Sequence, residues 1–264
     1  MRLSIQADLD YHFREPTDVL LALEVAQTAD QKLVEDLLKV GGAGPLRPIP
    51  DEDGISRRTW MRAQGPFHAE YRATVDLDHR PTDLAALQAS ELIGLPAAVV
   101  PYLWPSRYCE ADRFEPFVEY RFGLLSGGVK IQAMSDWIAR EMAYVPGSSN
   151  TATTAADVFV SRQGVCRDYA HLLASFARAA GIPARLVSAY AWRLDPPDFH
   201  ALVEVWLDGA WHGVDATGLA PPEGLVRICS GRDATDIAFM TSFGFAEMVG
   251  QRVSVKRVDE PAPV

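Results

Sequence analysis

The sequence predicts an α+β protein in which a small antiparallel β domain precedes a layer of helices and a second antiparallel sheet. Two observations predict this class: apolar and polar residues alternate in the first half of the chain, and apolar residues recur at helical spacing after residue 129. Strand-like segments follow those helices, an order typical of α+β proteins. We expect residues 1–125 to form an N-terminal β-rich domain and residues 126–264 to form the second domain.

The N-terminal region is patterned mostly as strands. Residues 3–9 alternate apolar and polar side chains, which is the period of a half-buried strand. Further strands are predicted over 20–25, 56–62 and 68–77, on either side of a Gly- and Pro-rich break at 41–50.

Two segments of this region are less regular. Residues 30–40 carry leucines at helical spacing, so a helix and a strand both stay open there. Residues 95–128 are interrupted repeatedly by proline, and their aromatic residues suggest a packed connector that ends at the boundary near residue 125.

The second region begins with helices. Apolar residues at helical spacing predict an amphipathic helix over 129–144, and a shorter helix is expected over 153–160 with Thr153 or Thr154 as its cap. A third helix is expected over 165–180. It ends at Gly181-Ile182-Pro183, because glycine adopts the terminating conformation and proline cannot continue a helix. Strands follow at 184–192, 200–207 and 211–215.

Composition limits the classes of function. The 264 residues include 25 Lys and Arg against 35 Asp and Glu, a formal net charge of −10, which argues against a nucleic-acid backbone as partner. No stretch approaches the ~20 apolar residues that span a membrane. The first residues carry acids where a signal peptide needs an apolar run. We therefore expect a cytoplasmic protein without a membrane partner, and the sequence does not indicate its oligomeric state.

One of the three cysteines is placed as a nucleophile. Cys166 follows Gly164 and Val165 at the start of a predicted helix, where free N–H groups and the positive end of the helix dipole favour a thiolate. The alternative is that Cys166 is a small buried apolar residue. Cys109 and Cys229 have neither this position nor a nearby base, and we interpret them as structural thiols.

A hairpin downstream supplies a base and an acid. Asp208-Gly209 between two apolar strands predicts a two-residue turn, which pairs Leu207 with Ala210. In that register His200 and Asp215 are diagonal neighbours on one face of the hairpin, about 7–8 Å apart at Cα. The carboxylate can then hold one imidazole nitrogen and direct the other toward a thiolate. A turn one residue longer would place Asp215 on the wrong face.

Three further residues are candidates for lesser roles. Asp168 lies in the first turn of the cysteine helix, where it complements the dipole or positions substrate or the preceding loop. Gln163 is a candidate oxyanion donor beside the backbone N–H of Cys166, and Trp192 is a candidate for lining a substrate groove. His171 is expected to be structural. No set of residues has metal-ligand or calcium-loop spacing, so we expect neither a metal nor another cofactor.

These residues lie in motifs that resemble the transglutaminase-like superfamily, in particular bacterial members described as candidate cysteine proteases. The resemblance covers about residues 130–245 and rests on four segments: 164–173, 179–185, 198–205 and 209–217. The spacing from Cys166 to His200 and then to Asp215 matches the triad of the family. The N-terminal half looks like the β-rich region that precedes the catalytic core in bacterial members.

The resemblance implies a papain-like core with Cys166 as nucleophile, His200 as general base and acid, and Asp215 as orienting carboxylate. The sequence departs from the family pattern at one position directly after Asp215. The family often has Asp-Pro-Thr where this chain has Asp215-Ala216-Thr217, which changes the stiffness of the loop but keeps the carboxylate.

The expected reaction is acyl transfer from an amide or isopeptide bond of a peptide or protein, through a thioester acyl-enzyme. Hydrolysis is the first choice, which would make the protein a protease or amidase. Amine transfer to protein glutamine and acyl transfer from a small-molecule donor use the same triad and stay open. A non-catalytic peptide-binding module is the alternative from another class.

Overall fold

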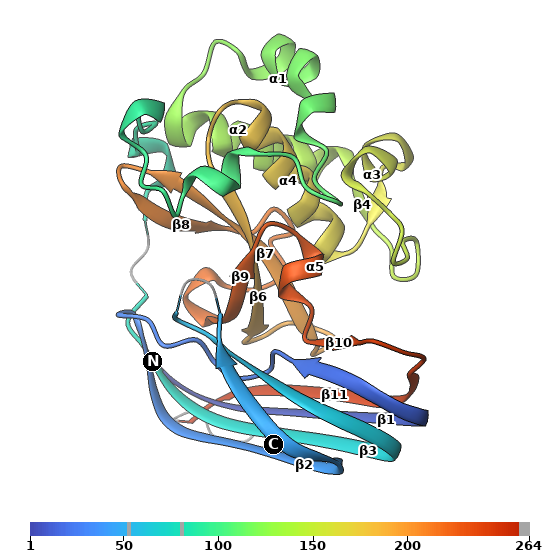
Figure 1. Ribbon diagram of the computed structural model, residues 1–264. Helices are drawn as coiled ribbons and strands as arrows, with labels where there is room; N and C mark the ends of the chain where they lie inside the picture. Colours follow the sequence, from blue (N-terminus) through green and yellow to red (C-terminus); the bar gives the residue numbers. More distant parts are fainter. Residues whose placement is uncertain (52–53, 80–81, 259–264) are drawn as a thin grey trace.

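The first part of the chain forms three long antiparallel strands: β1 (Arg2–Leu21), β2 (Gln31–Pro50) and β3 (Arg57–Leu77). The computed structural model describes residues 1–51, 54–79 and 82–258, and Figure 1 shows these strands as the lower sheet. Alternate residues of β1 and β3 are buried, as the period-2 pattern predicts. Residues 31–40, for which helix and strand were both open, are extended in β2 because they pair with β3.

The strand predicted over 20–25 is wrong beyond Leu21. After that residue the chain leaves the sheet, and its backbone N–H groups form hydrogen bonds with other segments. The N–H of Ala22 donates to the carbonyl of Phe239, and the N–H of Ala26 donates to the carbonyl of Arg227.

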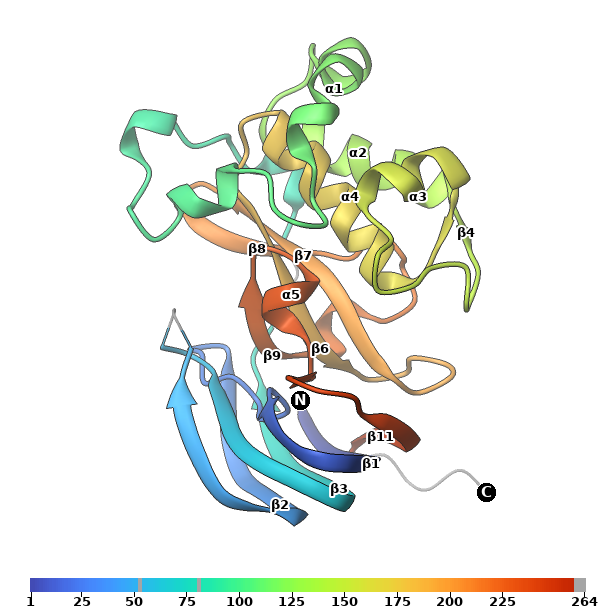
Figure 2. The ribbon, with the colours of Figure 1, turned by 45° about the vertical axis from the view of Figure 1, so that its right-hand side comes forward.

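The C-terminal strands belong to the same sheet. β10 (Met240–Ser242) and β11 (Glu247–Arg257) both pair antiparallel with β1, on the edge opposite β3. Figure 2 shows β11 beside β1. The two ends of the chain therefore share one sheet, while the division of the chain at residue 125 stays a prediction.

The second sheet has the order β8–β7–β6–β9 and is antiparallel throughout. Its strands are β6 (Ala184–Ala191), β7 (Phe199–Leu207), β8 (Ala210–Val214) and β9 (Leu225–Gly231). The predicted hairpin register is confirmed: Leu207 pairs with Ala210, and Asp208 and Gly209 both have positive φ.

Helices cover one face of this sheet (Figure 1). They are α1 (Glu115–Phe122), α2 (Gly127–Glu141), α3 (Ala155–Ser161) and α4 (Cys166–Ala179), with a short α5 (Ala234–Ile237) beside β9. Short 3-10 turns lie at Leu84–Ala86, Leu92–Gly94, Val100–Leu103, Ala111–Arg113 and Pro222–Gly224. The predicted α+β class is confirmed, and α2, α3 and α4 lie where apolar spacing placed helices.

The segment expected as a packed connector contains an unpredicted helix, α1. Pro116 lies in its first turn, where proline is tolerated because the N–H has no helical partner. The segment is packed, since Phe114 lies 5.3 Å from Phe176 of α4 and Tyr102 lies 5.3 Å from Trp211, centroid to centroid.

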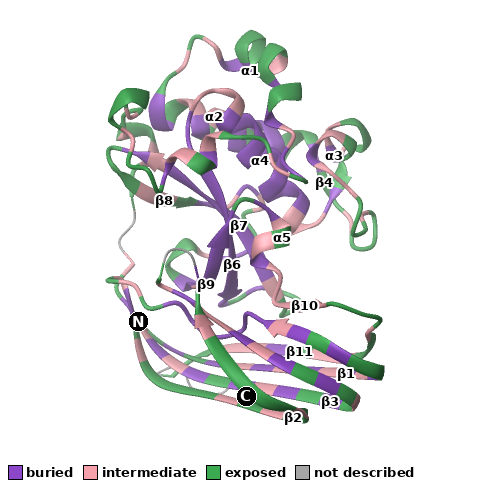
Figure 3. Ribbon diagram, in the orientation of Figure 1, coloured by how far each residue is buried: buried purple, intermediate pink, exposed green. Residues whose placement is uncertain are grey.

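α4 packs on β6 and β7 in the core beside the second sheet. All eight residues of β6 are buried, whereas most of β2 is exposed (Figure 3). Buried contacts also join the two sheets. The rings of Tyr71 and Tyr190 stack at 6.2 Å, and the Tyr190 hydroxyl donates to the carbonyl of Leu23 at 2.7 Å. Within the described ranges, no helix combines the length and apolar character needed to cross a bilayer.

Candidate active site

Cys166 is the first residue of α4 and differs from the other two cysteines in its surroundings. Its side chain is partly exposed, whereas Cys109 and Cys229 are buried. Burial raises the pKa of each of these two thiols to about 11, so both are held as neutral thiols. The backbone N–H groups at the start of α4 lie beside Cys166 and favour a negative charge there.

Asp168 fixes the start of this helix. Its side chain is fully buried, and its Oδ2 accepts from the Val165 N–H at 2.8 Å and the Ser149 hydroxyl at 2.5 Å. Its Oδ1 lies 3.2 Å from Nη2 of Arg167. Gly164 leaves the room that this arrangement needs, because a Cβ there would lie 2.7 Å from the Cβ of Asp168. Asp168 thus holds the loop before Cys166, and a contact with substrate stays a prediction.

His200 and Asp215 form a buried hydrogen-bonded pair. Nε2 of His200 lies 2.7 Å from Oδ2 of Asp215, and the two side chains are 0% and 5% exposed. The other carboxylate oxygen, Oδ1, accepts from the backbone N–H of Thr217 at 2.9 Å and from its hydroxyl at 2.7 Å. The carboxylate is therefore held on both sides and orients the imidazole.

The second ring nitrogen of His200, Nδ1, is buried and has no hydrogen-bond partner among the described residues. Burial disfavours the charged imidazole, but the hydrogen bond to Asp215, together with the negative charges of Asp215 and Cys166, outweighs that cost. These interactions raise the pKa of His200 to about 10. An imidazolium beside a thiol at a helix N-terminus is the arrangement that stabilises a thiolate.

Tyr144 is a functional candidate that the sequence did not indicate. It ends the two-residue strand β4 (Ala143–Tyr144), which pairs in parallel with β5 (Gln163–Gly164), two residues before Cys166. Tyr144 is 41% exposed, and its hydroxyl lies near enough to Cys166 to interact with it electrostatically. Burial and the nearby Cys166 charge raise the pKa of Tyr144 to about 12, so the hydroxyl remains a donor at neutral pH.

The predicted helix over 129–144 is wrong at its end, because α2 stops at Glu141 and the next residues form this small ladder. A ladder of two residues leaves no periodic signal in the sequence. The aromatic residue beside the nucleophile could therefore be found only from the structure.

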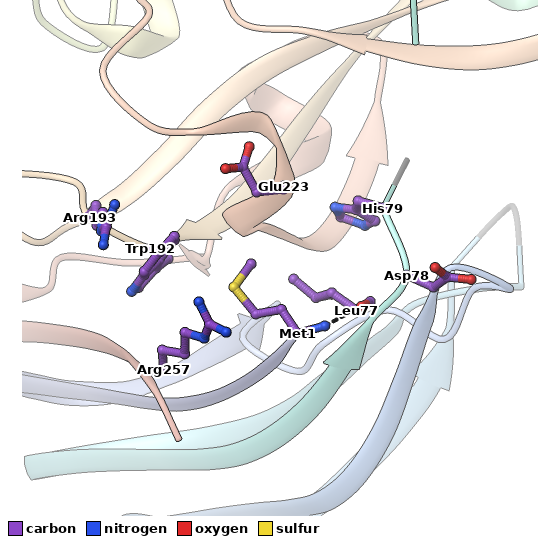
Figure 4. Close-up of a pocket in the computed structure, with 8 residues that line it drawn as sticks. All are labelled: Met1, Leu77, Asp78, His79, Trp192, Arg193, Glu223 and Arg257. Atoms are coloured by element: carbon purple, nitrogen blue, oxygen red, sulfur yellow. Dashed lines mark hydrogen bonds between the residues drawn. The ribbon is translucent and has the colours of Figure 1, made fainter. Parts of the chain in front are cut away.

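Gln163 and Trp192 have different environments. Gln163 is exposed, and its backbone forms the β5 ladder. Trp192 is buried and lines a cavity of about 480 Å³ between the end of β6 and the N-terminal sheet, with Met1, Arg193 and Arg257 (Figure 4). Roles for Gln163 and Trp192 in substrate positioning stay predictions.

His171 has a structural environment. Burial lowers its pKa to about 3, and its Nε2 accepts from the Ala234 N–H at 3.1 Å. Its ring stacks on Tyr108 at 5.1 Å. Among the described residues, no cluster of three or more His, Cys, Asp or Glu side chains is arranged to hold a metal ion.

Comparisons with known proteins point to one family. The family model of the transglutaminase-like superfamily matches residues 124–216. The crystal structure of a candidate cysteine protease from Cytophaga hutchinsonii superposes with a TM-score of 0.91 at 34% identity. That superposition covers 99% of this chain and 92% of the other.

Curated relatives match shorter segments. An uncharacterized protein of Mycobacterium leprae is 28% identical over 116 residues, covering 41% of this chain and 42% of that protein. A protein-glutamine gamma-glutamyltransferase of Pseudomonas aeruginosa is 40% identical over 77 residues, covering 25% of this chain and 12% of that enzyme. This chain spans less than half the length of the curated relatives it matches.

Proposed function

The chain belongs to the transglutaminase-like superfamily, and on that premise we propose that it is a cysteine-dependent acyl-transfer enzyme that hydrolyses amide bonds of peptides or proteins. One observation carries the proposal. The buried imidazole of His200 is held by Asp215 through a 2.7 Å hydrogen bond and interacts electrostatically with Cys166, at the start of α4. This is the arrangement of nucleophile, base and orienting acid that acyl transfer requires.

In the first half-reaction the Cys166 thiolate attacks the carbonyl carbon and forms a C–S bond, while the carbonyl electron pair moves to oxygen. The backbone N–H of Cys166 and the nearby hydroxyl of Tyr144 are the donors that we assign to this oxyanion. His200 is protonated at neutral pH, and it gives its proton to the leaving nitrogen as the C–N bond breaks. The amine departs, and a thioester remains on Cys166.

In the second half-reaction water attacks the thioester. His200 accepts a proton from the water as the new C–O bond forms, and the electron pair of the C–S bond returns to sulfur. The products are a carboxylic acid and the original pair of thiolate and imidazolium. Asp215 keeps the ring in one orientation through both steps, because Thr217 holds the carboxylate from its other side.

Amine transfer is the second candidate, favoured by the 40% identity to the gamma-glutamyltransferase segment. A primary amine that attacks the same thioester in place of water gives a new amide. The two reactions share the acyl-enzyme and differ only in the second nucleophile.

Thiol reactivity tests the shared chemistry. The protein is treated with limiting iodoacetamide at pH 6, and labelling of Cys109, Cys166 and Cys229 is quantified by mass spectrometry, with N-acetylcysteine as the reference thiol. Cys166 should react at least about tenfold faster than N-acetylcysteine, and His200→Ala should remove that lead. A Cys166 rate equal to that of the free thiol would contradict the proposal and favour a peptide-binding module.

A second assay separates the two reactions. β-Casein is incubated with the protein and monodansylcadaverine, and the products are mapped by mass spectrometry. Hydrolysis gives new termini or deamidated side chains, whereas amine transfer adds the mass of the dansyl amine at glutamine. Cys166→Ala is the control, and it should abolish either product.

A further inference from the structure

Asp198 is an exposed carboxylate close in sequence to the candidate base. It lies in the loop that joins β6 to β7, immediately before the first residue of β7 and two residues before His200. Side chains two residues apart in an extended segment lie on the same side. Asp198 is therefore positioned on the side of the strand that His200 turns toward Cys166 and Asp215.

Two hydrogen bonds hold this carboxylate in place. Its Oδ1 accepts from the backbone N–H of Phe199 at 2.7 Å and from Nε2 of Gln251 at 2.6 Å. Gln251 belongs to β11, so the N-terminal sheet anchors the loop that precedes the candidate base. Figure 2 shows this loop beside β11.

The second oxygen of Asp198, Oδ2, faces solvent without a partner. No hydrogen bond or ion pair involves it anywhere in residues 1–51, 54–79 and 82–258. Such an oxygen is an oriented acceptor, because the two hydrogen bonds already fix its carboxylate. Binding a ligand therefore costs little further side-chain conformational entropy.

The charge of Asp198 also reaches the candidate active site. Burial and the charge of Cys166 are the larger causes of the raised pKa of Tyr144, and the negative charge of Asp198 adds to them. Coulomb interactions of this kind weaken with distance, so the exposed loop that carries Asp198 is close enough to influence the candidate active site.

We propose that Asp198 determines specificity by binding a cationic side chain, that of Lys or Arg, beside the reacting amide of the substrate. The proposal rests on the proposed function and assigns its substrate class. The ammonium or guanidinium group would donate to Oδ2, while Phe199 and Gln251 keep Oδ1 in place. An acidic side chain at the same position would be repelled.

Charged thiol reagents test, without a substrate, whether the negative charge of Asp198 affects reactions at Cys166. Aminoethyl methanethiosulfonate is cationic, the sulfonatoethyl analogue is anionic and the methyl analogue is neutral. Each forms a mixed disulfide with Cys166 and releases methanesulfinate. Rates are measured for the wild type, for Asp198→Asn, which keeps an oxygen for the two anchoring donors, and for Asp195→Asn, a charge control in the same loop.

We expect the ratio of the cationic to the anionic rate at Cys166 to fall about tenfold in Asp198→Asn, because a nearby unit charge changes the two rates by about threefold in opposite directions. The ratio should change less than about twofold in Asp195→Asn, and the neutral rate should stay similar in all three proteins. Equal ratios in wild type and Asp198→Asn would overturn the proposal.

Peptide cleavage tests the substrate class directly. Matched peptides carry Lys, Arg, norleucine or Glu beside the cleaved amide, chosen from a cleavage site mapped in β-casein. Asp198→Asn should lower kcat/KM about tenfold for the Lys and Arg peptides and leave the norleucine peptide within about twofold. Equal cleavage of Lys and norleucine peptides by the wild type would overturn the proposal while leaving hydrolysis intact. A Cys166 that is inert toward the neutral reagent would instead overturn the proposed function.

Discussion

The variant Asp215→Asn tests how the carboxylate controls the proton of His200. In the wild type, Oδ1 of Asp215 accepts from the N–H and the hydroxyl of Thr217, and Oδ2 accepts from Nε2–H of His200. The backbone N–H of Thr217 can only donate, so the single oxygen of Asn must face it. The amide NH2 group then faces His200, and Nε2 has to accept instead of donate.

In this arrangement the charged form of His200 loses the carboxylate that stabilises it. A raised pKa of about 10, against 6.5 for an ordinary histidine, corresponds to a free energy on the order of 5 kcal/mol in favour of the charged ring. Burial opposes that charge, and Asp215 is the first of the interactions that outweigh it. In Asp215→Asn we expect the pKa of His200 to fall to 6.5 or below, with its neutral proton on Nδ1. Activity at neutral pH should fall by about 10³–10⁴-fold, because Nδ1 can then no longer accept a proton.

The ring nitrogens report this change directly. Long-range ¹H–¹⁵N spectra of the histidines, with His200 assigned from a His200→Gln variant, give both its pKa and its tautomer. Asp112→Asn, which replaces an exposed acid, is the control and should leave the spectrum of His200 unchanged. A His200 that still titrates near pH 10 in Asp215→Asn would refute the reasoning.

Stability should respond to pH with a defined sign. The pKa of His200 is higher in the folded chain than the 6.5 of the unfolded chain, so its contribution is complete below about pH 6.5 and is lost as pH rises toward 10. Urea unfolding across this range should show the loss in the wild type and a smaller one in Asp215→Asn. Parallel curves for the two proteins would contradict this linkage.

Three further changes probe other parts of the molecule. Tyr144→Phe removes the proposed oxyanion donor, and we expect kcat to fall by about 10²–10³-fold with little change in the alkylation rate of Cys166. Steady-state kinetics and labelling measure the two quantities. His171→Gln removes a buried group whose pKa is lowered to about 3, so the free energy of unfolding should fall less as pH drops from 6.5 toward 3 than it does in the wild type. Glu204→Gln leaves the guanidinium groups of Arg185 and Arg227 without their buried carboxylate, and urea unfolding should show a loss of about 3–5 kcal/mol.

Each of these changes has its own control. Tyr120→Phe alters an exposed tyrosine and should leave kcat unchanged, whereas equal losses in the two tyrosine variants would exclude a specific role for Tyr144. His68→Gln alters an exposed histidine, and it should not reproduce the effect of His171→Gln on acid stability. Glu223→Gln is the exposed counterpart of Glu204→Gln, and equal unfolding midpoints for these two variants would show that the buried network contributes nothing measurable.

The geometry of His200 and Asp215 could be predicted because it depends on local chemistry. The Asp208-Gly209 turn has only two residues, both at positive φ, and its length determines which side chains of the two strands share a face. Likewise the position of Cys166 at a helix start follows from the apolar spacing of α4 and from the preceding glycine. Short-range patterns of this kind can be recognised in a single sequence.

The long-range pairings could not be predicted in the same way. Leu3 pairs with Arg257, and no pattern in either segment predicts that the two strands are neighbours. Residues 31–40 illustrate the converse, since their leucines suggest a helix while pairing with β3 keeps them extended. Tyr144 reaches Cys166 only through the β4–β5 ladder, which is too short to leave a pattern.

The sheet shared by both ends of the chain has a consequence for biosynthesis. β1 emerges from the ribosome before its partner β11, which follows roughly 10–50 s later at about 5–20 residues per second. During that interval one edge of β1 lacks its neighbour and can pair with other nascent chains. Gln251, which anchors the loop before His200, is synthesised with β11. A nascent chain therefore carries Cys166 before this anchor of the active-site loop has been synthesised.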